Sequence, residues 1–305
     1  MVSQQEDKAI RVLIAFPNDG ETGNGLVEAF KERGHDVDHL CATRHPYNLY
    51  SQMCKGGYEF VLMSRTIGLY PGFVRAKMKY PDTKFAIWNV DIREKIEEWG
   101  LLVNFIQEVD YYFVVASGVV KKWSLINPNT YFVPQGLQKE RYHPVCPTDE
   151  QLDKYKCDVS FIGNLSMPEI HKERAGILHA LEDSRFDFKH LTGVYGGEHN
   201  AAVASAMISL GVTHSPHISH YVSVRDWKIM GAGGILLEQS HPGINDLTRG
   251  YAHQYVDAGD CIDQVGKILC NLEEEKKKAR ECAEWVLSSQ CYVHRAEMIE
   301  GIICG

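Results

Sequence analysis

Arg225 and Lys228 stand three residues apart in the segment SVRDWKIMGAGGILLE (223–238), ahead of a run of glycines. On a helix, residues at this spacing share one face, so the two cations could hold a diphosphate between them. The glycines would let such a helix end abruptly against the next strand. The segment therefore predicts a site for a phosphorylated ligand, although solvated surface charges would produce the same pattern.

Three histidines precede this segment at intervals of three: His214, His217 and His220. A zinc-dependent hydrolase is one interpretation, because imidazoles are common zinc ligands. Pro216 lies inside the triplet, however, and proline disfavours the continuous helix that would present all three rings on one face. We therefore predict no metal site at this position.

Two glycine-bearing loops follow apolar runs. PNDGETGNG (17–25) lacks the G-x-G-x-x-G spacing of a dinucleotide site, so it predicts either a tight turn or a close backbone approach to a ligand. Asp19 in this loop could meet an acceptor hydroxyl. FIGNL (161–165) repeats the geometry, with Gly163 and Asn164 at the turn.

Asp91 follows another apolar run, in WNVDIR. A carboxylate at the end of a buried strand could accept a proton from an attacking hydroxyl. It could equally cap the helix predicted after it, because aspartate is a favoured N-cap residue. Both interpretations stay open.

Short apolar runs alternate with helical patterns along the whole chain, which indicates parallel sheets built from strand–helix–strand units. We predict an α/β fold of two Rossmann-like, doubly wound domains that face a central cleft, where loops at the carboxyl ends of the strands bind ligands. Residues 1–143 would form the first domain and 144–287 the second, with a polar, proline-bearing linker at 144–156. One long charged helix is predicted at about 260–287, and a final helix within 288–305 would pack back on the first domain.

The composition is that of an ordinary globular protein, with 305 residues and a formal net charge of −8. The N-terminus is polar and no run of about 20 apolar residues appears, so neither a membrane span nor a secretory signal is expected. The nine cysteines include no C-x-x-C pair, which predicts free and mostly buried thiols. The cytoplasm is the expected compartment.

Several of these segments together resemble a known family. FIGNL with Arg174 downstream, the stretch SVRDWKIMGAGGILLEQSHPGINDL, and CYVHRAEMI near the end resemble the glycosyltransferases related to spore-maturation proteins (glycosyl transferases group 1). This family has the two-domain GT-B fold. The resemblance implies a nucleotide-sugar donor, held by the second domain as a co-substrate without a further cofactor, and an acceptor held by the first.

The resemblance also suggests donor-binding residues. Gly163 and Asn164 would approach the diphosphate, and Arg225 and Lys228 would neutralise it. Arg174 would belong to the same site, and Glu238 or a neighbour would reach the ribose. Many retaining enzymes of this fold carry two glutamates eight residues apart, but His220 and Lys228 occupy those positions here. This departure casts doubt on the usual retaining mechanism and predicts that His220 faces the donor sugar or its phosphates.

A leaving nucleoside diphosphate gains negative charge in the transition state, so Arg225 and Lys228 could lower the barrier without a metal. If the reaction inverts, it needs a base near the acceptor, for which Asp91 and Asp19 are the candidates. We predict transfer of a hexose, most simply glucose from a UDP-sugar, to an acceptor hydroxyl. A non-catalytic regulator that binds a nucleotide sugar is the alternative, and the missing glutamate pair is its main support.

The acceptor stays open between a glycan, a hydroxymethylated base in DNA, and a protein or small molecule. A basic and aromatic stretch, YPGFVRAKMKYPDTKF (70–85), could guide a phosphate backbone, with Arg44, His45 and Arg65 close by in the sequence. Its predicted acceptor-binding residues are Arg65, Arg75, Lys77 and Lys79. A solvated helix face is the alternative interpretation of this stretch.

Overall fold

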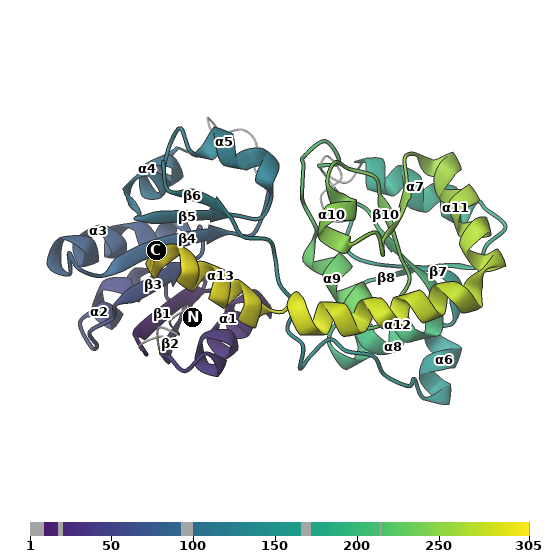
Figure 1. Ribbon diagram of the computed structural model, residues 1–305, viewed down its shortest axis with the longest axis horizontal. Coiled ribbons are helices and arrows are strands. Elements are labelled where there is room, and N and C mark those ends of the chain that lie inside the picture. The colour runs from purple at the N-terminus through teal and green to yellow at the C-terminus, as the bar shows by residue number, and fades with distance from the viewer. Residues whose placement is uncertain (1–8, 18–20, 93–99, 166–171, 214, 305) are drawn as a thin grey trace, which may run out of the picture. The chain divides into compact units, whose positions relative to one another are not determined.

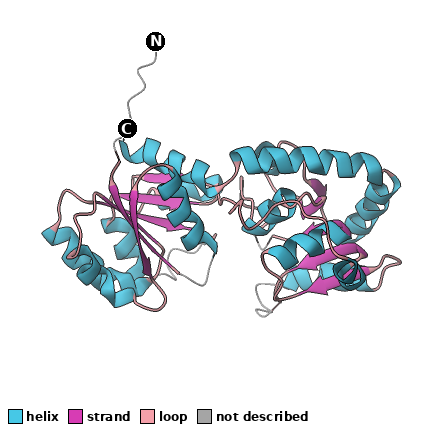
Figure 2. Cartoon of the chain, turned by 90° about the horizontal axis from the view of Figure 1, so that it is seen from below, coloured by secondary structure: helices cyan, strands magenta, loops and turns pink. Residues whose placement is uncertain are grey.

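The computed structural model describes all residues except 1–8, 18–20, 93–99, 166–171, 214 and 305 (Figure 1). The chain divides into two units: Met1–Pro134 together with Tyr292–Gly305, and Gln135–Cys291. Each unit is an α/β layer structure around a parallel sheet, with helices on both sides (Figure 2). The predicted fold class of two parallel-sheet domains is confirmed.

The first unit contains a six-stranded sheet in the order β2-β1-β3-β4-β5-β6. Its inner strands read as continuous apolar runs because helices cover both faces. The strands are β1 (Arg11–Phe16), β2 (Asp36–Cys41), β3 (Phe60–Met63), β4 (Lys84–Asn89), β5 (Tyr111–Val114) and β6 (Thr130–Phe132). The helices are α1 (Glu21–Glu32), α2 (Leu49–Met53), α3 (Tyr70–Lys79), α4 (Leu101–Glu108), α5 (Val120–Trp123) and α13 (Tyr292–Cys304).

Helix α13 comes from the end of the chain and packs against α1 of the first unit (Figure 1). Glu300 on α13 bonds Arg33 at 2.5 Å and His35 at 2.9 Å. The ring of Tyr292 lies so close to Gly25 that a Cβ there would be 2.3 Å from it, which is why only glycine fits at this position.

The second unit contains a five-stranded sheet in the order β11-β10-β9-β7-β8. Its strands are β7 (Cys157–Ile162), β8 (Phe188–Leu191), β9 (Ala206–Gly211), β10 (Leu236–Gln239) and β11 (His253–Tyr255). Its helices are α6 (Asp149–Tyr155), α7 (Lys172–Glu182), α8 (Gly197–Ser205), α9 (Val224–Gly231), α10 (Ile244–Thr248), α11 (Ala258–Cys270) and α12 (Leu272–Ser289). Apolar side chains of β7, β9, β10, α7 and α11 form its core.

Three local predictions differ from the structure. The long charged helix is two helices, because Asn271 leaves the helical conformation (φ −119°) and ends α11 before α12 begins. Part of the predicted linker is helix α6, whose first turn is held by a capping box between Thr148 and Gln151. The edge strand β2 was not predicted, because only Val37 and Leu40 of its sequence DVDHLC are buried and it forms no apolar run.

The boundary between the units lies at Pro134–Gln135, nine residues before the predicted position. Residues of the intervening segment pack on the second unit, since Asn200 donates to the carbonyl of Arg141 at 3.0 Å and Tyr142 packs edge-on against His199. The nine cysteines are free, and the prediction that most are buried is wrong: four are buried and four are exposed. None of the helices in the described part of the chain is long and apolar enough to cross a membrane.

Candidate functional site

A cavity of about 410 Å³ lies at the carboxyl ends of β7 and β8 in the second unit. Ligands of parallel α/β sheets bind at this edge, where loops and helix starts converge. The lining residues come from the loop after β7, the loop after β8, and the helices α8 and α9: Ile162, Gly163, Asn164, Thr192, Gly193, Val194, Tyr195, His199, Val224, Arg225 and Lys228. The structure therefore brings together four of the predicted donor-binding residues, Gly163, Asn164, Arg225 and Lys228.

Arg225 is held against the loop after β7. Its Nε donates to the carbonyl of Ile162 at 3.0 Å, and its guanidinium lies over the ring of Phe161, 5.0 Å from the centroid. A Cβ at Gly163 would lie 2.7 Å from that ring and 3.0 Å from Nη2 of Arg225. Glycine is required at position 163 because any side chain would push the arginine or the ring away.

Arg174 supports the same loop from behind. Its guanidinium is buried, donates to the carbonyls of Asn164 and Val212 at 3.1 Å each, and also lies over the ring of Phe161. Burial and the charge of Arg225 lower the pKa of Arg174 to about 10. Arg174 does not line the cavity, so it positions the loop, and its repulsion with Arg225 favours an anion beside the pair.

Lys228 reaches the cavity next to a histidine that the sequence analysis missed. Its Nζ lies 4.7 Å from the ring centroid of Tyr142, and the same ring packs edge-on against His199 at 5.2 Å. Burial, Lys228 and Arg225 lower the pKa of His199 to about 3, so its imidazole is neutral at pH 7. Nδ1 of His199 has no hydrogen-bond partner among the described residues.

A signal for His199 was present in the sequence. GVYGGEHN (193–200) follows the apolar end of a strand and opens a helix with two glycines, as the other two glycine-bearing loops do. Gly193 and Gly196 have φ values of +70° and +55°, which glycine adopts readily. A third strand–glycine–helix junction was thus readable, but nothing in the sequence predicted the burial of the histidine.

His220 does not line the cavity. Its backbone has φ +53°, its N–H donates to the carbonyl of Pro242 at 2.7 Å, and its Nε2 lies 3.2 Å from Oδ2 of Asp246. Of the other histidines in the triplet, His217 is exposed and His214 lies outside the described residues. Within the described ranges, no three histidine, cysteine or acidic residues are grouped closely enough to hold a metal ion.

Glu238 is buried beneath the site, with 1% of its surface exposed, and does not line the cavity. Burial raises its pKa well above the usual value, and the neighbouring Asp226 carboxylate raises it further. Both carboxyl groups lie over Gly211, where a Cβ would come within 1.7 Å of Oε2 of Glu238. These surroundings favour the neutral form of Glu238, and its contact with a ribose stays a prediction.

The first unit brings Arg65 and Asp91 together at the carboxyl ends of β3 and β4. Nη2 of Arg65 donates to Oδ2 of Asp91, whose side chain is 51% exposed. Nearby, Asn89 donates to the hydroxyl of Tyr112 at 3.0 Å. Asp19 and residues 93–99 lie outside the described residues, so the capping interpretation of Asp91 stays a prediction.

The predicted basic surface on α3 is not gathered around one cavity. Arg75 lies over the ring of Tyr50 at 4.1 Å. Lys77 bonds the carbonyl of Glu108 and, at 3.3 Å, Asp110. Lys79 donates to the thiol of Cys54 at 3.7 Å. Lys79 also lies over the ring of Tyr50, so Arg75 and Lys79 share one partner on α2, whereas Lys77 turns to Glu108 and Asp110.

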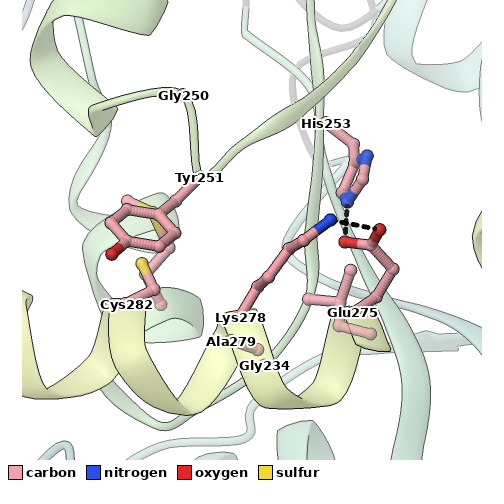
Figure 3. A pocket seen from close by; sticks show the side chains of 10 residues that line it. Gly234, Gly250, Tyr251, His253, Glu275, Lys278, Ala279 and Cys282 are labelled. Atoms are coloured by element: carbon pink, nitrogen blue, oxygen red, sulfur yellow. Dashed lines mark hydrogen bonds and ion pairs between the residues drawn. The ribbon is translucent and has the colours of Figure 1, made fainter. Parts of the chain in front are cut away.

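A smaller hollow of about 90 Å³ lies between β11 and α12 (Figure 3). His253 and Lys278 both point to Glu275, at 2.9 and 3.1 Å. Although burial raises the pKa of Glu275, its bonds to Lys278 and His253 outweigh this effect and lower the pKa. The hollow has room for a few waters but not for a nucleotide, so this ion-pair cluster fixes α12 on the sheet.

The sequence model of a family described as glycosyl transferase-like matches residues 150–301, which include the whole cavity. The second half of the chain belongs to this glycosyl transferase-like family. The predicted enzyme class, a glycosyltransferase, is thereby confirmed. Among curated protein sequences, none matches the chain.

Solved structures similar to this glycosyltransferase include sucrose-phosphate synthase from Thermosynechococcus elongatus, with 10% identity, a TM-score of 0.70, and coverage of 96% of this chain and 98% of that one. The Anabaena protein HepE in complex with UDP-glucose has 9% identity and a TM-score of 0.68, with 97% and 100% covered. T4 phage β-glucosyltransferase has 9% identity and a TM-score of 0.59, with 95% and 99% covered. These likenesses establish the GT-B fold.

Proposed function

We propose that this glycosyltransferase transfers a hexose, most simply glucose from UDP-glucose, to an acceptor hydroxyl. The observation that carries the proposal is the cavity at the ends of β7 and β8, where Arg225 and Lys228 converge beside a glycine turn. A nucleoside diphosphate matches this charge. A similar fold is recorded with UDP-glucose in HepE, which supports the same donor here.

The chemistry follows from the charges in the cavity. When the bond between the sugar and the diphosphate breaks, negative charge grows on the leaving oxygen. Arg225 and Lys228 stabilise that charge, and the repulsion of Arg225 with Arg174 is relieved at the same time. His199 lines the cavity and is neutral, so it adds no further positive charge beside the donor.

The reaction is proposed to need no metal and no further cofactor, since the two cations supply the positive charge. A T4 phage β-glucosyltransferase structure contains both UDP and Mn²⁺, which makes a chelator test informative. Unchanged turnover in excess EDTA is the expected result. We also propose the cytoplasm as the compartment, because nine cysteines that form no disulfide fit a reducing environment.

Asp91 is the proposed base if the reaction inverts, with Asp19 as the second candidate. The ion pair with Arg65 holds the Asp91 carboxylate in one orientation and leaves half of it exposed to an acceptor. Asp91→Asn should abolish transfer and leave UDP binding intact, while Asp82→Asn, at an exposed acid of the same unit, should change neither. Near-normal turnover by Asp91→Asn would remove Asp91 from this role.

For the acceptor we propose a glycan or a hydroxymethylated base in DNA. A DNA-modifying β-glucosyltransferase is among the similar folds, which supports the second choice. Lys77 turns to Asp110, away from the ring of Tyr50 that Arg75 and Lys79 share; this weakens it, because a nucleic-acid track needs cations that face the same backbone.

The deciding experiment is a thermal-shift screen of nucleoside diphosphates and nucleotide sugars with the purified protein. A ligand raises the melting temperature according to its concentration and affinity, so UDP and UDP-glucose should both stabilise the protein. No stabilisation by any nucleotide would refute the proposal. Slow release of glucose from UDP-glucose in water would separate the enzyme from a regulator that only binds its ligand.

A further inference from the structure

A second large cavity, of about 380 Å³, opens in the first unit at the carboxyl end of β2. Strand β2 and the start of the loop after it form one side, and helix α2 forms the other. The lining residues are His39, Leu40, Cys41, Arg44, His45, Asn48, Ser51, Gln52 and Lys55. All but two of them carry nitrogen or oxygen in the side chain, so the cavity is suited to a polar ligand.

The described side chains that line this cavity carry positive charge that no ion pair among them neutralises. Arg44 and Lys55 are exposed, and among the described residues neither side chain has an ion pair or hydrogen bond. None of the described residues that line the cavity is acidic. The nearest acids in sequence, Asp36 and Asp38, are bound to Arg11 at 3.2 and 3.1 Å. In a chain with a net charge of −8, this concentration of cations predicts an anionic ligand.

The polar side chains between the cations suit hydroxyl groups. Ser51 donates to the carbonyl of Asn48 at 3.0 Å, so its oxygen is left to accept a hydrogen bond. The amide of Gln52 donates to the hydroxyl of Tyr58 at 2.9 Å, which leaves its carbonyl oxygen as an acceptor. An arginine and a lysine for a phosphate, beside acceptors for hydroxyls, match a phosphorylated sugar or polyol.

The cavity also lies on the edge of the sheet where the proposed base stands. The sheet is parallel, so β2 and β4 both end at this edge, and Asp91 follows β4. Three strand spacings separate β2 from β4, which is about 14 Å. A molecule anchored by its phosphate near β2 could therefore present a hydroxyl at Asp91 if it is about 14 Å long. One hexose phosphate is shorter than this, so the acceptor would be a longer phosphorylated sugar or polyol, and glucose 6-phosphate serves as a probe of its anchored end.

We infer that this cavity holds the phosphate of a phosphorylated sugar or polyol acceptor, and so sets the acceptor class. The inference rests on the proposed function, because it assigns the acceptor of that reaction. A single phosphate fits better than a DNA backbone. The cations are grouped in one hollow, and the cations next to it on α3, Arg75 and Lys79, are engaged with Tyr50 and Cys54.

The test measures binding in the first unit while UDP saturates the donor cavity. Thermal shifts are recorded at constant ionic strength with inorganic phosphate, glucose 6-phosphate, glucose and a short DNA duplex. Wild-type protein should be stabilised by phosphate and more strongly by glucose 6-phosphate, but not by glucose. Arg44→Ala/Lys55→Ala should weaken the affinity for glucose 6-phosphate by about tenfold or more, because it removes both charged donors.

Lys31→Ala/Lys121→Ala is the matched control, since it removes two exposed cations of the same unit that lie outside the cavity. It should bind glucose 6-phosphate as wild type does. Equal affinity in both double variants would overturn the inference, as would stabilisation by the DNA duplex with none by glucose 6-phosphate. If UDP does not stabilise wild type, the proposed function is refuted. The phosphate series can also be run without UDP, so the binding of phosphate in this cavity is tested separately.

Discussion

Arg174 and Arg225 both lie over the ring of Phe161, but replacing them should change different properties of the protein. Arg225 lines the donor cavity and is partly exposed, whereas Arg174 is buried and bonds two backbone carbonyls. Arg225→Met and Arg174→Met each remove one positive charge and keep an aliphatic stem of similar length. The pair therefore separates binding of the ligand from support of the loop.

The expected sizes follow from these contacts. A charge-assisted hydrogen bond to the diphosphate is worth about 1.5–3 kcal/mol, so Arg225→Met should weaken UDP binding by about 10- to 100-fold. Its stability should change by less than about 1 kcal/mol, because losing the bond to Ile162 is offset by relief of the repulsion with Arg174. Arg174→Met leaves the carbonyls of Asn164 and Val212 without their donor and should cost about 2–4 kcal/mol.

The assay combines titration calorimetry with UDP and urea unfolding followed by tryptophan fluorescence. We expect Arg174→Met to lose stability with less than about a tenfold change in UDP affinity. If Arg225→Met unfolds as readily as Arg174→Met and keeps its UDP affinity, the division of roles between the two arginines is wrong.

Three further outcomes are expected. The stability of Glu238→Gln relative to wild type should increase as pH rises. The pKa of Glu238 is higher in the folded state than in the unfolded state, so wild type loses up to about 1.4 kcal/mol of stability per pH unit between these two pKa values. Thermal melts from pH 5 to 8 that show no divergence between the two proteins would contradict this. Gly163→Ala should weaken UDP binding about tenfold or more, since its Cβ would lie 2.7 Å from the ring of Phe161, whereas Gly176→Ala, where the space is open, should bind normally in the same calorimetric assay. Glu300→Gln should lower the free energy of unfolding by about 2–3 kcal/mol in urea titrations, because it removes the negative charge between Arg33 and His35 and replaces one of the two accepting oxygens by a donor. An unchanged midpoint would count against that role of α13.

The sequence by itself was enough for the fold class and for some of the residues that meet in the cavity at the ends of β7 and β8. Buried parallel strands are apolar along their whole length, so their order along the chain is visible without a structure. The edge strand β2 was the exception, because only two of its six residues, Val37 and Leu40, are buried. Arg225 and Lys228 could be paired in advance because a helix fixes the direction of residues three apart, and the glycine at position 163 marked a close approach of the backbone.

Only the tertiary structure decided which of these groups are accessible and which are charged. Burial lowers the pKa of His199, and Lys228 and Arg225, which are more than 25 residues away in the chain, lower it further. Glu238, predicted at the ribose, is buried beside Asp226, and Arg65, predicted at a phosphate backbone, bonds Asp91. Burial and pairing depend on segments that meet only when the chain folds, so residue type and spacing identify the candidates, and the packing around each one sets its chemistry.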